Sequence, residues 1–229
     1  MKRPLPYLRR MWATDVALTM LLVFLLIFIF LLFPMGQIGS VKFLTNLVFS
    51  FILITGAIAA AKSRILKRLV LLWGVIAFVF IWVRHLFPHQ ALVFVTTCLS
   101  LTFLVLLAFL ILGQTFREGP TTSHRIMGSV AVYLLLGLIW SLAYQLTALC
   151  VPSAFFIQLP ITAGDTQSLE SHLFYFSFVT LTSLGFGDIV AVHPMARMLA
   201  ILEGVTGQLF PVILIARLVS LHLEAKHKK

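Results

Sequence analysis

A run of nine residues, Thr180 to Asp188, combines residue types that can bind a cation through the main chain. It reads T-L-T-S-L-G-F-G-D, with two glycines around one phenylalanine. Glycine adopts backbone angles that other residues avoid, so it can turn successive carbonyl oxygens toward one side. A ring of such oxygens can replace the water shell of a potassium ion. Residues 182–188, named the glycine loop below, therefore predict a cation-binding backbone wherever the surrounding elements hold them in place.

The composition of the chain is typical of a membrane protein. Of its 229 residues, 61% are hydrophobic and only 10% are charged, whereas about a quarter of the residues in soluble domains are charged. A net charge of +10 could indicate nucleic-acid binding, but basic residues also gather on the cytoplasmic side of membrane spans. We therefore expect membrane lipid around the chain and no nucleic-acid partner.

Six apolar runs are long enough to cross a bilayer as helices. Each has roughly 18–23 residues, which suits a hydrocarbon core of about 30 Å. The runs cover residues 12–33, 42–61, 69–86, 91–113, 128–150 and 195–217. The sequence thus predicts an all-α membrane protein with six transmembrane helices.

The basic residues predict the orientation of these helices. With the N-terminus inside, fourteen of the 17 Lys and Arg residues lie on the cytoplasmic side, and only Lys42, Arg84 and Arg197 lie outside. The reverse orientation would contradict the excess of basic residues in cytoplasmic loops. We expect a multi-pass protein of the cell (inner) membrane with both termini in the cytoplasm.

This orientation requires residues 151–194 to leave and return on the same side. The first part reads as an external loop, but the part that follows is too apolar for open water. A helix over 171–182 would be about 18 Å long, too short to cross. Non-helical backbone is tolerated at membrane depth only where protein buries it or it lines a water-filled path. We therefore expect a re-entrant segment with the glycine loop at its deep end.

The nine-residue run resembles the pore signature T-x-T-T-V-G-Y-G-D of tetrameric potassium channels. The resemblance covers about 128–220, and it aligns Tyr175 and Phe176 with an aromatic pair of that family. It also aligns Gly207 with the family's inner-helix hinge glycine. It implies a homotetrameric channel, because one chain supplies one pore segment and a ring of carbonyls needs about four.

By that resemblance, the glycine loop is a selectivity filter and the permeant ion is K⁺, with no other cofactor. Thr182 would close the pore helix, and the Ser183 hydroxyl would bind ions together with main-chain carbonyls. The residues supplying those carbonyls would be Ser183, Leu184, Gly185 and Phe186, with Gly187 completing the filter. Serine and phenylalanine replace the family's threonine and tyrosine, which leaves a weakly selective cation channel as an alternative.

Four further residues are expected to support the filter or its gating. Val179 stands where some relatives have a glutamate that pairs with the aspartate, so Asp188 needs another partner, and we expect the Tyr175 hydroxyl. Phe176 is expected to support the filter as well. Glu203, an acid inside the sixth run, could steady the pore helix or tune the cavity. It could instead make only a structural hydrogen bond to a nearby Ser, Thr or Gln.

Gly207 and Pro211 in the sixth run predict a gating hinge, because proline frees a backbone carbonyl and kinks helices. Close helix packing at a small residue is the alternative for Gly207. The fourth run contains no charged residue, so we do not expect the first four spans to sense voltage.

The expected organisation has five parts, which are a cytoplasmic N-terminus (1–11), a peripheral four-helix membrane domain (12–113), a cytoplasmic linker (114–127), a pore domain (128–220) and a basic tail (221–229). A secondary transporter is a second alternative, but such proteins usually show repeated halves, and no repeat is visible. The seven acidic residues form no catalytic cluster, so we do not expect an enzyme.

Overall fold

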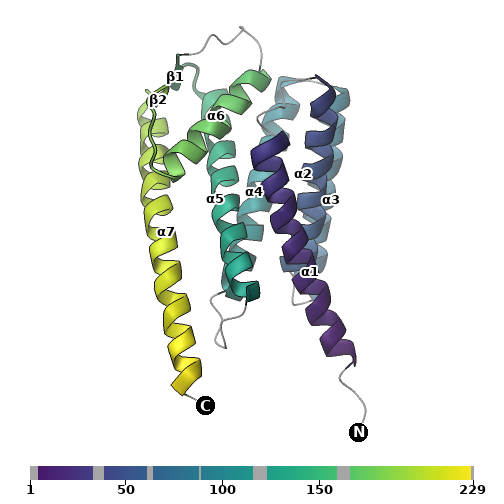
Figure 1. Cartoon of the computed structure of the whole chain (residues 1–229). Coiled ribbons are helices and arrows are strands. Elements are labelled where there is room, and N and C mark those ends of the chain that lie inside the picture. The colour runs from purple at the N-terminus through teal and green to yellow at the C-terminus, as the bar shows by residue number, and fades with distance from the viewer. Residues whose placement is uncertain are drawn as a thin grey trace.

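Long helices follow all six apolar runs (Figure 1). The computed structural model describes residues 5–32, 39–60, 64–87, 89–115, 123–158 and 166–227. Its elements in chain order are α1 (Leu5–Ile27), a π-helical turn η1 (Phe28–Leu32), α2 (Gly39–Ala60), α3 (Arg64–Leu86), α4 (Gln90–Thr115), α5 (Ser123–Cys150), β1 (Phe155–Ile157), α6 (Thr166–Leu181), β2 (Ile189–Ala191) and α7 (Pro194–His227).

Three helices in the described part of the chain are long and apolar enough to cross a membrane. They are Gln90–Gly113, Ile126–Cys150 and Pro194–Ser220. Shorter apolar helices lie at Val16–Leu32, Phe43–Ala59 and Val70–Leu86. These lengths and compositions support a helical membrane protein.

The ends of several helices differ from the predicted boundaries. Helix α1 begins at Leu5, inside the predicted N-terminal segment, and α7 continues to His227, inside the predicted tail. The predictions for residues 1–4, 33–38, 61–63, 88, 116–122, 159–165 and 228–229 fall outside the described residues. These include half of the predicted linker and part of the predicted external loop.

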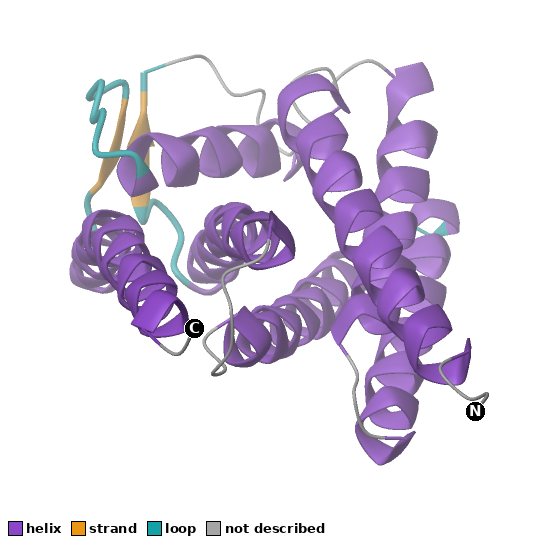
Figure 2. Cartoon of the chain, turned by 60° about the horizontal axis from the view of Figure 1, so that its bottom comes forward, coloured by secondary structure: helices purple, strands orange, loops and turns teal. Residues whose placement is uncertain are grey.

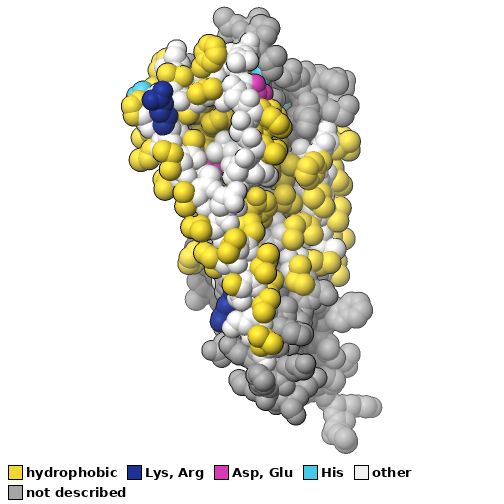
Figure 3. Space-filling view, turned by 60° about the vertical axis from the view of Figure 1, so that its left-hand side comes forward, with side chains coloured by type: hydrophobic (Ala, Val, Ile, Leu, Met, Phe, Trp, Pro, Cys, Tyr) yellow, Lys and Arg dark blue, Asp and Glu magenta, His cyan; other side chains and the backbone are white. Residues whose placement is uncertain are grey.

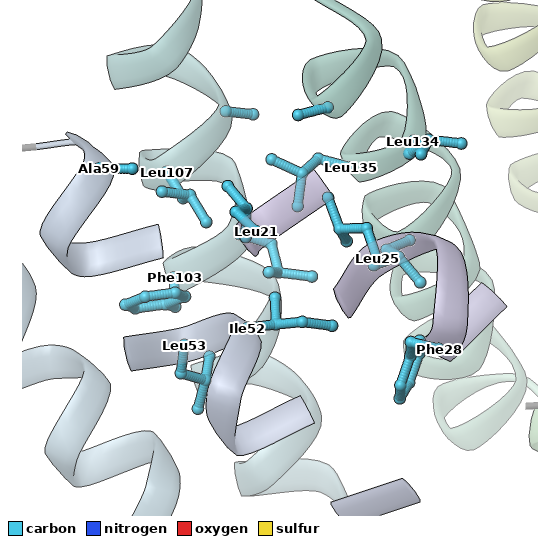
Figure 4. Close-up of a cluster of buried hydrophobic side chains, with 14 of the residues drawn as sticks. Leu21, Leu25, Phe28, Ile52, Leu53, Ala59, Phe103, Leu107, Leu134 and Leu135 are labelled. Atoms are coloured by element: carbon cyan, nitrogen blue, oxygen red, sulfur yellow. The ribbon is translucent and has the colours of Figure 1, made fainter. Parts of the chain in front are cut away.

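Helix α5 lies between two groups of helices and packs against both. It contacts α1 and α4 on one side and α6 and α7 on the other, and Figure 2 shows it between these groups. On the first side, buried apolar side chains fill the space between α1, α2, α4 and α5. Figure 4 shows part of this core, including Leu21, Leu25, Ile52, Phe103, Leu107 and Leu135.

Helix α6 is short and crosses the half of α5 that is nearer Cys150 at an angle (Figure 1). The predicted helix, 171–182, was wrong at its start, because α6 begins five residues earlier at Thr166. The prediction followed apolar residues, whereas the first turns of α6 carry the polar sequence T-Q-S-L-E-S. The helix is thus longer than its apolar part.

Residues 155–157 and 189–191 form a two-stranded antiparallel ribbon. For the first of these two segments we had expected only an external loop. The ribbon pairs Phe155 with Ala191 and Ile157 with Ile189. The N–H of Gln158 continues the ladder by donating to the carbonyl oxygen of Asp188 at 3.1 Å. The ribbon therefore ties the end of the glycine loop to the chain that leaves α5.

Candidate functional site

Helix α6 ends in a hydrogen-bonded cap that starts the glycine loop. The N–H of Ser183 donates to the Thr180 carbonyl at 3.0 Å, and the N–H of Leu184 donates to the Val179 carbonyl at 2.9 Å. This pair of bonds forms a Schellman motif, whose first residue beyond the cap is left-handed and usually glycine. Ser183 fills that position with a φ of 59°. The loop therefore leaves α6 at a fixed angle.

The sign of φ alternates along the glycine loop. It is positive at Ser183, Gly185 (56°) and Gly187 (81°), and not at Leu184 or Phe186 between them. Alternating the hand of the backbone turns successive N–H groups to one side, which gathers carbonyl oxygens on the other. A Cβ on either glycine would meet no atom within 4 Å, so backbone angle rather than crowding explains why glycine suits these positions.

The main-chain oxygen atoms of the loop are free of hydrogen bonds from the described residues. Among the described residues, no hydrogen bond ends on the carbonyl oxygens of residues 183–187, and the side chains of Leu184 and Phe186 are 61% and 64% exposed. No three His, Cys, Asp or Glu side chains of the described ranges gather as a metal site. In the described part of the chain, the loop therefore presents carbonyl and hydroxyl oxygens rather than a cluster of side-chain metal ligands.

Helix α7 meets the inner end of α6 through two consecutive residues. A Cβ on Gly207 would lie 2.0 Å from the Leu181 carbonyl oxygen, so only glycine allows this approach. The next residue, Gln208, donates from Nε2 to the Ser183 hydroxyl oxygen at 2.7 Å. From α5, the Tyr133 hydroxyl reaches the same Leu181 oxygen at 3.4 Å. Three helices thus converge at the start of the glycine loop.

Gly207 therefore takes part in close packing, the alternative that the sequence left open for it. Helix α7 runs without interruption from Pro194 to His227, and Pro211 lies inside it. Proline has no N–H to donate to the carbonyl four residues earlier, which here belongs to Gly207. The hinge at Gly207 and Pro211 stays a prediction.

Glu203 lies in a buried polar cluster that joins α5, α6 and α7. Tyr144 donates its hydroxyl hydrogen to Glu203 Oε2, and Ser177 Oγ lies 2.6 Å from Glu203 Oε1. Ser177 Oγ is also 2.7 Å from the Gly137 carbonyl oxygen. Glu203, Tyr144 and Ser177 are each 0% exposed, so this cluster holds α6 against both neighbouring helices away from the surface of the chain.

Three aromatic rings pack edge to face around the C-terminal half of α6. Tyr144, Phe155 and Phe176 form a triangle with centroid separations between 5.0 and 5.6 Å. Such arrangements contribute about 0.5–1.5 kcal/mol per pair beyond the burial of apolar area. Phe176 therefore fixes α6 to α5 and to the ribbon.

Tyr175 lies against Asp188, the residue that ends the glycine loop. Burial raises the pKa of the Tyr175 hydroxyl, and a hydrogen bond to Asp188 and the charge of that carboxylate raise it further. Asp188 Oδ1 also accepts from the N–H of Ile189 at 3.1 Å. The role of Tyr175 as the support of Asp188 stays a prediction, but the two residues are neighbours.

An ion pair connects the first four helices to α6. The Arg84 guanidinium in the last turn of α3 contacts the Glu170 carboxylate near the start of α6. The two side chains are 30% and 20% exposed, and pairs of this exposure contribute about 0.2–1 kcal/mol. The ion pair therefore connects α3 to α6 but contributes little to the stability of the fold.

Sequence reasoning missed Gln208, Ser177, Tyr144 and Glu170 as parts of this site. Gln208 carried a signal, since a polar amide beside Gly207 interrupts an otherwise apolar run. Ser177 and Tyr144 carried none, because each finds its partner only when separate helices pack together.

Comparison with known families gives one match. Residues 131–223 match a family model described as "Ion channel", which is less than half of the chain. The match supports an ion channel. It extends from α5 through α6 and the glycine loop into α7, and leaves out α1–α4. No curated protein and no solved structure matches the chain. With the three long apolar helices, the match supports a membrane protein.

Proposed function

We propose that the chain is the subunit of a potassium-selective channel that passes K⁺ down its electrochemical gradient. Four copies would surround one central path, with six transmembrane helices in each copy and both termini in the cytoplasm of a cell (inner) membrane. The glycine loop would form the filter, and residues 128–220 the pore domain. The family match to an ion channel supports the general function, and the backbone of the glycine loop supports K⁺ as the permeant ion.

The observation that carries the proposal is the alternating sign of φ at Ser183, Gly185 and Gly187. It turns carbonyl oxygens of successive residues to a common side, and those oxygens accept no hydrogen bond from the described part of the chain. Rings of such carbonyls replace the hydration shell of K⁺ in potassium-selective pores. Ion binding by the Ser183, Leu184, Gly185 and Phe186 carbonyls follows from this geometry as a proposal.

Assembly into a tetramer is supported by the surface of α7. Figure 3 shows the face on which α7 lies, with hydrophobic side chains over most of its length and basic ones near its two ends. Exposed apolar residues of α7 include Met198, Ile201, Val205, Leu209 and Val212. One loop supplies one carbonyl per level, so a closed ring needs several copies around a symmetry axis.

The test is ion flux in liposomes that contain the purified protein. Vesicles loaded with K⁺ and diluted into K⁺-free buffer should lose K⁺ rapidly, and vesicles loaded with Na⁺ should not. Comparable Na⁺ loss would instead indicate the weakly selective cation channel. Light scattering on the purified protein should give the mass of four chains.

Gly185→Ala is the decisive variant. Its Cβ meets open space, but the left-handed backbone costs a non-glycine residue about 1–2 kcal/mol, so the carbonyl ring should distort and K⁺ flux should fall at least about tenfold. Gly113→Ala is the matched control, since that helical glycine also faces open space and has no positive φ. Unchanged K⁺ flux in Gly185→Ala would contradict the assignment of the glycine loop as the selectivity filter.

A further inference from the structure

The hydroxyl group of Ser183, which the proposed function places beside the ion path, also takes part in a hydrogen bond within the chain. It accepts a hydrogen bond from Gln208 Nε2 at 2.7 Å. Both residues are exposed on the single chain, so neither is locked in place by a surrounding core. The bond between them therefore decides which way the Ser183 side chain points.

The backbone around this bond is fixed by other contacts. Ser183 is the left-handed residue of the cap that ends α6. Residues other than glycine are uncommon in this conformation, so a second bond to the same residue stabilises it. On the α7 side, Gly207 rests on the Leu181 carbonyl, which sets the distance from which Gln208 reaches out.

We infer that Gln208 is a positioning residue that holds the Ser183 hydroxyl at the inner entrance of the ion path and so sets how tightly a cation binds there. The inference rests on the proposed function and adds a residue that acts on its first binding site. A hydroxyl oxygen has two lone pairs. The hydrogen bond from Gln208 occupies one lone pair of Ser183 Oγ. The second lone pair stays available to a cation, and the hydrogen bond fixes the direction in which it points.

The probe is Ba²⁺ added to each side of single channels in planar bilayers. Ba²⁺ resembles K⁺ in size and carries twice the charge, so it binds oxygen ligands more tightly and reports their arrangement by block. Gln208→Leu keeps the approximate volume and removes the donor. Losing one hydrogen bond of ordinary strength should change the half-blocking Ba²⁺ concentration from the inner side by roughly 2- to 10-fold.

A double-mutant cycle separates this role from a merely structural one. Ser183→Ala removes the acceptor, so adding Gln208→Leu to it should change inner Ba²⁺ block no further. Thr206→Val is the control, because among the described residues the Thr206 hydroxyl bonds only to the Leu202 carbonyl of its own helix, at 2.7 Å. Its Ba²⁺ block should match that of the parent. Gln208→Asn, whose shorter amide cannot reach Ser183, serves if the leucine variant fails to assemble.

The outcomes distinguish the two proposals. Absence of K⁺ current in the parent protein would overturn the proposed function itself. Parent current with Ba²⁺ block that is unchanged in both Gln208 variants would overturn only the role of Gln208. Additive shifts in the double variant would also overturn it, because they would show that Gln208 acts on something other than the Ser183 hydroxyl.

Discussion

Tyr144 of α5 donates its hydroxyl hydrogen to the Glu203 carboxyl group of α7, and both residues are fully buried. The second carboxyl oxygen meets Ser177 Oγ, which is also 2.7 Å from the Gly137 carbonyl oxygen. Ser177 donates its one hydroxyl hydrogen to Glu203 Oε1, and the same hydrogen can be shared with the Gly137 carbonyl oxygen. Each carboxyl oxygen of Glu203 therefore accepts from a different helix, Oε2 from α5 and Oε1 from α6.

Glu203→Gln should preserve the cluster. The amide oxygen can accept from Tyr144 and the amide nitrogen can donate to Ser177, whose own hydrogen then goes to the Gly137 carbonyl oxygen. Glu203→Ala removes both partners and should lower stability by about 1–3 kcal/mol. The measurement is the thermal dissociation temperature of the purified oligomer. Equal damage by the two substitutions would show that Glu203 acts as a carboxylate.

Gly207→Ala and Gly204→Ala are a matched pair on one helix. The Cβ of the first would lie 2.0 Å from the Leu181 carbonyl oxygen, and that of the second would meet nothing within 4 Å. We expect Gly207→Ala to push α7 away from α6 and reduce the yield of assembled protein. Gly204→Ala should be neutral or stabilise α7 by about 0.5–1 kcal/mol. Similar size-exclusion profiles for the two variants would contradict close packing at Gly207.

Tyr175→Phe should shorten channel openings modestly, because the Asp188 carboxylate loses a neighbouring hydroxyl donor and Tyr175 is 37% exposed, so solvent weakens the interaction. Single-channel records give the open times directly. The raised pKa of Tyr175 adds a pH prediction. The hydroxyl donates while protonated, and a pKa above its ordinary value keeps it protonated, so open times should not change between pH 7 and about 9. Open times equal to those of the parent would count against a role for this bond.

Voltage should have little effect on opening. A charge that crosses the membrane field contributes about 2.3 kcal/mol per 100 mV, and α4 has no charged residue in Gln90–Thr115. Arg84 lies in the last turn of α3, paired with Glu170. Open probability should therefore stay nearly constant from about −100 to +100 mV. A steep conductance–voltage curve accompanied by gating current would contradict this.

The helices and the glycine loop could be predicted because their signals are local. Apolar length indicated where α4, α5 and α7 run, and Gly185 and Gly187 marked non-helical backbone in an apolar segment. The start of α6 was missed because its first turns are polar. The bonds of Gln208 to Ser183 and of Glu203 to Tyr144 join residues 25 and 59 positions apart. Their pairing depends on how three helices pack, and one sequence does not specify that packing by pattern alone.

The contact between Arg84 and Glu170 gives the first four helices a mechanical connection to the glycine loop. It holds α6 near its outer end, while Gly207 and Tyr133 hold its inner end at Leu181. A displacement of α3 would therefore tilt α6 about Leu181 instead of sliding it, and the tilt would reach Ser183 two residues later. Bilayer thickness acts on the tilt of spanning helices. The Arg84–Glu170 pair is therefore the place where a change in the tilt of α3 would act on α6, while the contacts at Leu181 would resist it.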